Sequence, residues 1–227
     1  MAITAPAPTR GSAADGIPSL VGRAALSAGV LGLALGTWCR SLVDGAAGAV
    51  GATLADLGGP WVLLAFVAGA VVIAPRSADP GVERVGVALG GMAGAGAMVI
   101  ASFTYYGGAS SVSAVFWATT GLLVGGAAGL AGAAWRSRPG GVLEAAAAGT
   151  LGLALAAEGI GRLELGWFHT TGHLADRASG WLVVAGLALP VLLTRGRPAG
   201  FVASCSVLLL AAPVALLVVM CSGLTIA

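Results

Sequence analysis

The chain has 227 residues, of which 58% are hydrophobic and only 9% are charged, and its mean hydropathy is +0.97. Soluble domains carry roughly 25% charged residues, so this composition excludes a soluble globular protein. A net charge of +2 without a basic stripe argues against nucleic-acid binding. We therefore expect an all-α, polytopic membrane protein whose first partner is the lipid bilayer.

The N-terminal residues 1–18 are rich in Pro and Ala and lack apolar periodicity, which predicts a flexible cytoplasmic tail before one transmembrane domain over 19–227. Seven apolar blocks follow, and they are 20–39, 59–74, 85–106, 112–135, 142–160, 179–193 and 199–221. A spanning helix needs about 20 apolar residues, so the second and sixth blocks are short. We expect seven spans, with six as the alternative.

The longest uncharged stretch runs over 51 residues, 85–135. A single helix of that length would reach far beyond one bilayer, so the stretch must contain two helices. The sequence GGASS at 107–111 is the natural place for the break. The third and fourth helices are therefore predicted to form a hairpin.

Arginine supplies all 11 basic residues, and these lie mainly between the apolar blocks. Seven spans put eight of them on one side, namely Arg10, Arg23, Arg76, Arg84, Arg136, Arg138, Arg195 and Arg197. The other three, Arg40, Arg162 and Arg177, fall on the opposite side. Because cytoplasmic connections carry the excess of positive charge, the chain is predicted to have its N-terminus inside and its C-terminus outside.

Glycine is abundant, with 38 residues, and it recurs every four residues in both helices of the predicted hairpin. The repeats are Gly86, Gly90 and Gly94 in the third helix and Gly121, Gly125 and Gly129 in the fourth. Small residues at this spacing let helix backbones approach closely within a membrane. We expect the two helices to pack through these faces.

Glu158 follows a long apolar run near the outer end of the fifth helix. An ionisable residue at membrane depth faces the protein interior or a wet cavity and is a candidate functional group. The alternative is a structural pair with Arg162, four residues further along the same helix. The sequence leaves both interpretations open.

Four aromatic residues, Tyr105, Tyr106, Phe116 and Trp117, lie at the outer tip of the hairpin. They form either an ordinary interfacial belt or the wall of an outward-facing pocket. The segment 40–58 is expected to be a surface helix or a re-entrant cap on the same side. It would bring Arg40, Asp44 and Asp56 towards Glu158, Arg162, Glu164 and the tyrosine pair.

Motifs for catalysis or metal binding are weak. His169 and His173 are four residues apart, but the intervening TTG disfavours a helix and no HExxH pattern is present. Three cysteines form no CxxC pair, but Cys39 and Cys221 fall at outer helix ends, where an oxidising exterior allows a disulfide between them. We expect no enzyme activity, no cofactor and no metal site.

Three pieces of the chain resemble an uncharacterised family of polytopic membrane proteins from actinobacteria. These pieces are PWVLLAFVAGA (60–70), WATTGLLVGGAAGLAGAAWR (117–136) and AAEG (156–159), and the tyrosine pair lies between the first two. The resemblance covers roughly residues 60–161. It implies a multi-pass protein of the bacterial plasma membrane and carries no activity with it.

Two hypotheses follow from the sequence. The first is binding or transport of a small solute in an outward-facing pocket lined by Glu158, Tyr105, Tyr106, Trp117, Arg40 and Arg162. The second is an accessory or structural protein that packs against a partner membrane protein through its Gly-rich helix faces. The substitution Glu158→Gln distinguishes the two.

Overall fold

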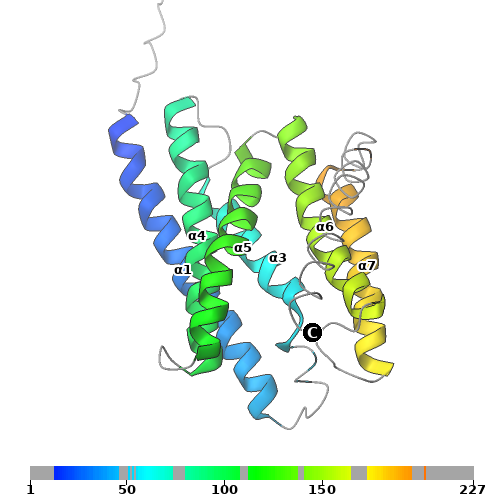
Figure 1. Ribbon diagram of the computed structural model, residues 1–227. Helices are drawn as coiled ribbons and strands as arrows, with labels where there is room; N and C mark the ends of the chain where they lie inside the picture. Colours follow the sequence, from blue (N-terminus) through cyan, green and yellow to red (C-terminus); the bar gives the residue numbers. More distant parts are fainter. Residues whose placement is uncertain are drawn as a thin grey trace, which may run out of the picture.

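The computed structural model describes residues 13–45, 51, 53, 55–73, 80–107, 112–137, 141–164, 173–195 and 202, without the side chains of 13–15, 164 and 173–177. In this part of the chain the regular elements are α-helices that run alternately up and down (Figure 1). They are α1 (Ala13–Asp44), α3 (Gly58–Val72), α4 (Pro80–Tyr106), α5 (Val112–Ser137), α6 (Val142–Glu164) and α7 (His173–Leu193). The all-α prediction is confirmed.

Four helices are long and apolar enough to cross a membrane: Gly16–Asp44, Pro80–Tyr106, Val112–Ser137 and Val142–Leu163. The segments Gly58–Val72 and Ala178–Leu193 are apolar but shorter, as the block lengths predicted. A helix satisfies its own backbone hydrogen bonds, which is what a chain inside lipid requires. The chain therefore has the helices of a membrane protein, but the count of about seven spans is not confirmed, since the block 199–221 lies almost wholly outside the described residues.

Two predicted boundaries differ from the structure. α1 begins at Ala13, inside the segment 1–18 that the sequence assigned to a tail, and Pro18 lies within the helix. α1 also continues through Arg40 to Asp44, so the predicted connection 40–58 begins as helix. Half of its remainder, residues 46–50, 52 and 54, lies outside the described residues, and the surface or re-entrant helix stays a prediction.

The hairpin break is confirmed. α4 ends at Tyr106 and α5 begins at Val112. Gly107 follows α4 with a φ of 79°, a left-handed conformation that glycine adopts without steric cost. Its N–H donates to the Phe103 carbonyl at 3.1 Å and closes the last helical turn.

The glycine repeats bring α4 and α5 together as predicted. A Cβ atom added at Gly125 would lie 2.7 Å from the Gly94 carbonyl oxygen, and one at Gly129 would lie 3.0 Å from the Gly94 Cα atom. Gly86 differs, because it faces Ile73 at the end of α3. The backbones of the hairpin therefore meet where side chains are missing.

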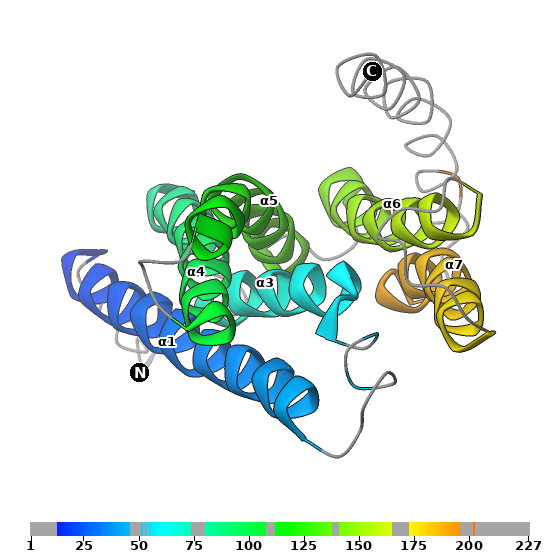
Figure 2. The ribbon, with the colours of Figure 1, turned by 60° about the horizontal axis from the view of Figure 1, so that its bottom comes forward.

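The helices that the structure describes form two groups (Figure 2). The first contains α1, α3, α4 and α5. The second is the pair α6 and α7, whose close contact again needs glycine, since a Cβ atom at Gly186 would lie 2.6 Å from the Gly152 carbonyl oxygen. α3 and α5 are the members of the first group that contact α6 of the second.

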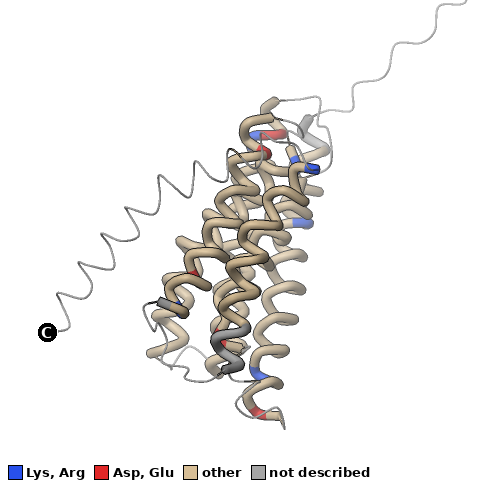
Figure 3. The backbone as a smooth tube through the Cα atoms, turned by 90° about the vertical axis from the view of Figure 1, so that its right-hand side faces the viewer, with Lys and Arg blue, Asp and Glu red and all other residues tan. Residues whose placement is uncertain are grey.

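Charged residues concentrate at the two ends of the bundle (Figure 3). Arg84 at the start of α4, Arg136 at the end of α5 and Arg195 after α7 share one end, which we call the arginine end. Arg40 and Arg162 lie near the other end, which we call the tyrosine end because α4 finishes there with Tyr105 and Tyr106. This separation matches the alternation on which the predicted orientation rests.

Candidate functional site

Glu158 lies on α6 and caps the first turn of α3. Its Oε1 accepts a hydrogen bond from the Gly58 N–H at 2.6 Å and another from the Arg162 Nε at 3.0 Å. The residue before α3, Leu57, makes no side-chain cap. The first N–H groups of a helix need acceptors and carry the positive end of its dipole, so a carboxylate is well suited to this position.

Arg162 extends this contact to the turn before α3, because its Nη2 donates to the Asp56 carbonyl oxygen. The side chains of Arg162 and Glu158 are only 4% and 13% exposed. We call Asp56, Gly58, Glu158 and Arg162 the α3–α6 clasp. The clasp joins the two groups of helices at the tyrosine end. Glu158 and Arg162 form the ion pair that the sequence offered as the structural alternative.

Glycine occupies both of the first two positions of α3, at the clasp. A Cβ atom at Gly58 would lie 3.1 Å from the Glu158 Oε2. One at Gly59 would lie 2.7 Å from the Leu182 Cδ2 and 2.9 Å from the Leu155 Cδ2. A side chain at either position would have to displace the ends of neighbouring Glu and Leu side chains, so glycine lets the start of α3 lie close to α6 and α7 without such a shift.

The Asp56 side chain gives the α3–α6 clasp a titratable carboxyl group besides Glu158. Burial raises the pKa of its carboxyl above the ordinary value of 3.8, and the nearby Arg162 partly offsets this rise. The backbone carbonyl of Asp56 accepts the hydrogen bond from Arg162, and this bond does not depend on the protonation of the Asp56 side chain. The carboxyl is thus a group whose ionisation weakens the folded state.

Arg40 forms a second, exposed ion pair at this end. Its Nε donates to the Asp44 Oδ2 at 2.5 Å, with the two side chains 51% and 56% exposed. Its Nη1 donates to the Tyr105 carbonyl oxygen at 3.3 Å and so ties the end of α1 to the end of α4.

An aromatic cluster lies next to this contact. The rings of Tyr105 and Tyr106 are 4.6 Å apart, and Tyr105 meets Trp61 of α3 edge-on at 5.9 Å. The Trp61 Nε1 donates to the Ala55 carbonyl oxygen at 3.4 Å. Among the described rings Trp117 contacts Phe116, at 5.3 Å, and is not joined to this cluster.

The structure thus brings five of the six predicted site residues into two sets of contacts at the tyrosine end. Glu158 bonds to Arg162, and Arg40 bonds to the backbone of Tyr105, whose ring meets that of Tyr106. Whether they bind a ligand stays a prediction. His169, Cys221 and the side chains of Glu164 and His173 lie outside the part that the structure describes. Cys39 is buried with a free thiol, and its predicted pairing depends on the undescribed Cys221.

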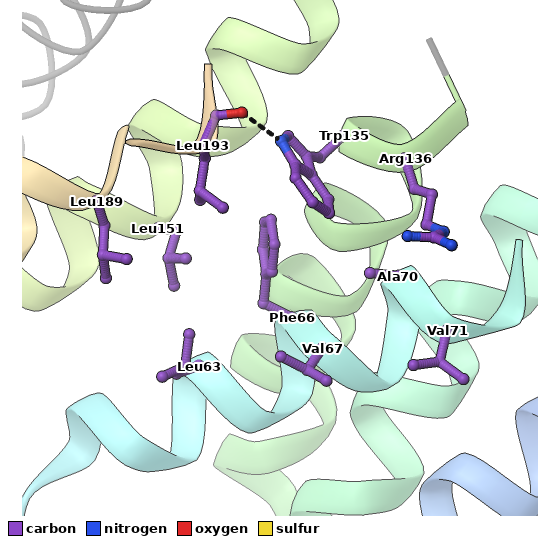
Figure 4. A pocket seen from close by; sticks show the side chains of 10 residues that line it. All are labelled: Leu63, Phe66, Val67, Ala70, Val71, Trp135, Arg136, Leu151, Leu189 and Leu193. Carbon is purple, nitrogen blue, oxygen red and sulfur yellow. Dashed lines mark hydrogen bonds between the residues drawn. The ribbon is translucent and has the colours of Figure 1, made fainter. Parts of the chain in front are cut away.

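A pocket of about 360 Å³ lies at a different place, between α3, α5, α6 and α7 (Figure 4). One wall is the stripe Leu63, Val67 and Val71 on α3. Leu151 of α6 and Leu189 and Leu193 of α7 form the other wall. Phe66 lies between them, and the pocket runs along α3 towards the arginine end.

Trp135 and Arg136, in the last turn of α5, line the pocket at the arginine end. The Trp135 Nε1 donates to the Leu193 carbonyl oxygen at 3.2 Å and links α5 to α7. The exposed Arg136 donates from Nε to the Ile73 carbonyl oxygen at 3.4 Å, at the C-terminal end of α3. The pocket is therefore apolar along its length and cationic at one end, which suits an amphipathic molecule.

The chain matches no family model, no curated protein and no solved structure. The resemblance to an actinobacterial family stays a prediction, and the geometry of the chain alone carries the functional argument.

Sequence reasoning did not identify Trp61, Gly58 or the pocket. Trp61 opens the second apolar block, and its position at a membrane boundary was the available signal. The Gly58–Glu158 bond joins residues 100 positions apart, and no local pattern reports such a contact. The pocket residues are ordinary apolar positions of four helices, so only the packing distinguishes them.

Proposed function

We propose that this chain is a multi-pass protein of the bacterial plasma membrane, without catalytic activity, whose role is to bind a small amphipathic molecule. The arginine end is on the cytoplasmic side in this proposal, because positive charge is retained there. The observation that carries the proposal is the pocket between α3, α5, α6 and α7. Its apolar walls and single cationic end give a ligand both a place and an orientation.

The polar residues of the tyrosine end also favour the pocket as the binding site, because their hydrogen bonds are already made within the protein. Glu158 and Arg162 bond to each other and to the backbone around the start of α3. A ligand that used them would have to displace contacts that hold the two helix groups together. The outward-facing site predicted from the sequence, with Tyr105, Tyr106 and Trp117, is therefore the weaker location for the solute.

Two matched variants test the pocket. Val67 lies on its α3 wall and is 40% exposed, whereas Val124 lies on α5 outside the pocket and is 39% exposed. Tryptophan at position 67 fills the pocket, and tryptophan at position 124 adds the same bulk elsewhere. The purified protein in mild detergent is screened by thermal shift against amphipathic metabolites.

We expect Val67→Trp to abolish the stabilisation that an active compound gives, and Val124→Trp to retain it. A stabilisation that survives Val67→Trp would place the ligand elsewhere and overturn the proposal. So would a screen in which no compound stabilises the protein.

An accessory role is the second candidate, and the outer face of α5 favours it. Leu122, Leu123 and Leu130 are exposed there, and α5 is the least covered of the four long helices. The glycine repeats of α4 and α5 are already used inside the bundle, so a partner would meet leucines rather than glycines. In this case Val124→Trp, and not Val67→Trp, would change the size of the assembly in mild detergent.

A further inference from the structure

We infer that the ligand of the pocket is an anionic phospholipid, with one acyl chain along α3 and its phosphate at Arg136. This inference rests on the proposed function and names the class of molecule that the pocket takes. Three features of the described residues carry it: the length of the apolar wall, the aromatic residue at its end and the placement of the guanidinium (Figure 4).

The apolar wall has the dimensions of one leaflet. Leu63, Val67 and Val71 are separated by four residues each and lie on one exposed stripe of α3. At 1.5 Å per residue this stripe is about 12 Å long. Half of a hydrocarbon core of about 30 Å is about 15 Å, so the stripe accommodates most of an acyl chain.

Trp135 and Arg136 lie where the headgroup of such a lipid would be. Tryptophan concentrates at the boundary between hydrocarbon and headgroups, and Trp135 is fixed at this level by its bond to the Leu193 carbonyl. The acyl chain would therefore end, and the phosphate begin, at the position that Trp135 marks.

Arg136 supplies the charge complementarity. It is the charged residue among those lining the pocket. Its bond to the Ile73 carbonyl uses Nε and places the guanidinium at the end of α3. A guanidinium has five N–H donors in a planar fork and binds phosphate with two parallel hydrogen bonds, so the Nη groups suit a phosphodiester. Basic pockets between helices at the cytoplasmic surface bind anionic headgroups in this way.

Arg136 also has a structural role, because a cation is favourable at the C-terminal end of a helix. A test must therefore separate loss of lipid selectivity from loss of stability. The ratio of anionic to zwitterionic lipid retained does this. A loosened pocket lowers the retention of both lipids, whereas a missing headgroup contact lowers the retention of the anionic lipid alone.

The experiment measures lipids retained by the full chain in native mass spectrometry, after equilibration with equal amounts of phosphatidylglycerol and phosphatidylcholine. We expect phosphatidylglycerol to be preferred. Arg136→Gln should reduce the preference about tenfold, as for the loss of a charge-assisted bidentate contact. Arg136→Lys should reduce it less. Arg84→Gln removes an exposed arginine at the same end, outside the pocket, and should leave the preference unchanged.

The remaining outcomes separate the two proposals. If the parent protein retains both lipids equally and Val67→Trp retains neither, the ligand is not specifically an anionic lipid, but the binding function stands. Competition by millimolar inorganic phosphate that Arg136→Gln abolishes would identify a free-phosphate site and overturn the lipid. If Val67→Trp leaves lipid retention unchanged, both the binding function and the lipid inference are overturned. A change of oligomeric state in Val67→Trp would also overturn both, because it would show that a second copy of the chain covers the α3 stripe.

Discussion

Two arginine–carboxylate pairs at the tyrosine end have the same helical spacing and different surroundings. Arg162 and Glu158 are almost completely buried, and Glu158 also accepts the Gly58 N–H. Arg40 and Asp44 are half exposed to the surroundings. Removing one partner of a buried pair leaves the other charge uncompensated, whereas an exposed pair contributes little.

We therefore predict that Glu158→Gln lowers the free energy of unfolding by about 2–4 kcal/mol, because Arg162 loses its counter-charge. The matched variant Asp44→Asn should lower it by less than about 0.5 kcal/mol. Denaturant unfolding in detergent, followed by tryptophan fluorescence, measures both. Equal effects of the two substitutions would mean that the clasp does not hold α3 to α6.

Asp56 gives the folded state a dependence on pH. Its pKa is raised by burial, so the folded chain binds this proton more tightly than the unfolded chain, and ionisation destabilises the fold. Stability is therefore lost as the pH rises from the ordinary value of 3.8 through the higher pKa of the folded state.

Asp56→Asn should raise the melting temperature at pH 7 and have little effect at pH 3, where the aspartate is mostly protonated in both states. Melting temperatures of the two proteins between pH 3 and pH 7 test this. A melting temperature of Asp56→Asn that stays below that of the parent protein across the range would contradict the assignment.

At the scale of elements, backbone contact at glycine holds the helices together. Gly129 packs against the Gly94 backbone, where a Cβ atom would lie 3.0 Å from both the Cα and the N atoms. Backbone cannot move aside as a flexible side chain can. Gly22 on α1 has nothing within 4 Å of the same position.

We predict that Gly129→Ala destabilises the protein by about 1–3 kcal/mol through overpacking. Gly22→Ala should instead stabilise it by up to about 1 kcal/mol, because alanine is the better helix former. Thermal unfolding in detergent should show shifts of opposite sign. A stabilising Gly129→Ala would rule out the close packing of α4 on α5.

Much of the arrangement of the helices was predictable from the sequence. The break near Gly107 and the meeting of Gly94 with Gly125 and Gly129 follow from helix length and from the spacing of small residues. The start of α1 at Ala13 did not follow, because a Pro/Ala-rich segment lacks the apolar periodicity that reports a helix. The clasp was half predictable: the Glu158–Arg162 pair follows from spacing, while its attachment to Gly58 depends on tertiary packing.

For the whole molecule, the separation of the arginine end from the tyrosine end is the central feature. Arg84, Arg136 and Arg195 lie at one end of the helices, and Tyr105, Tyr106 and Asp44 lie at the other. The sequence predicted this polarity because charge interrupts apolar blocks in a regular order. It could not predict the pocket, which depends on how far α3 is left uncovered between the two helix groups.

Cysteine accessibility in intact cells tests this account most directly. With Cys39, Cys205 and Cys221 replaced by serine, one cysteine is placed at Asp44 at the tyrosine end or at Gly141, an exposed position before α6 at the arginine end. A membrane-impermeant maleimide should label the Asp44→Cys protein in intact cells and the Gly141→Cys protein only after permeabilisation. Labelling of Gly141→Cys in intact cells, or the same labelling at both positions, would contradict a chain that crosses the membrane with its arginine end inside.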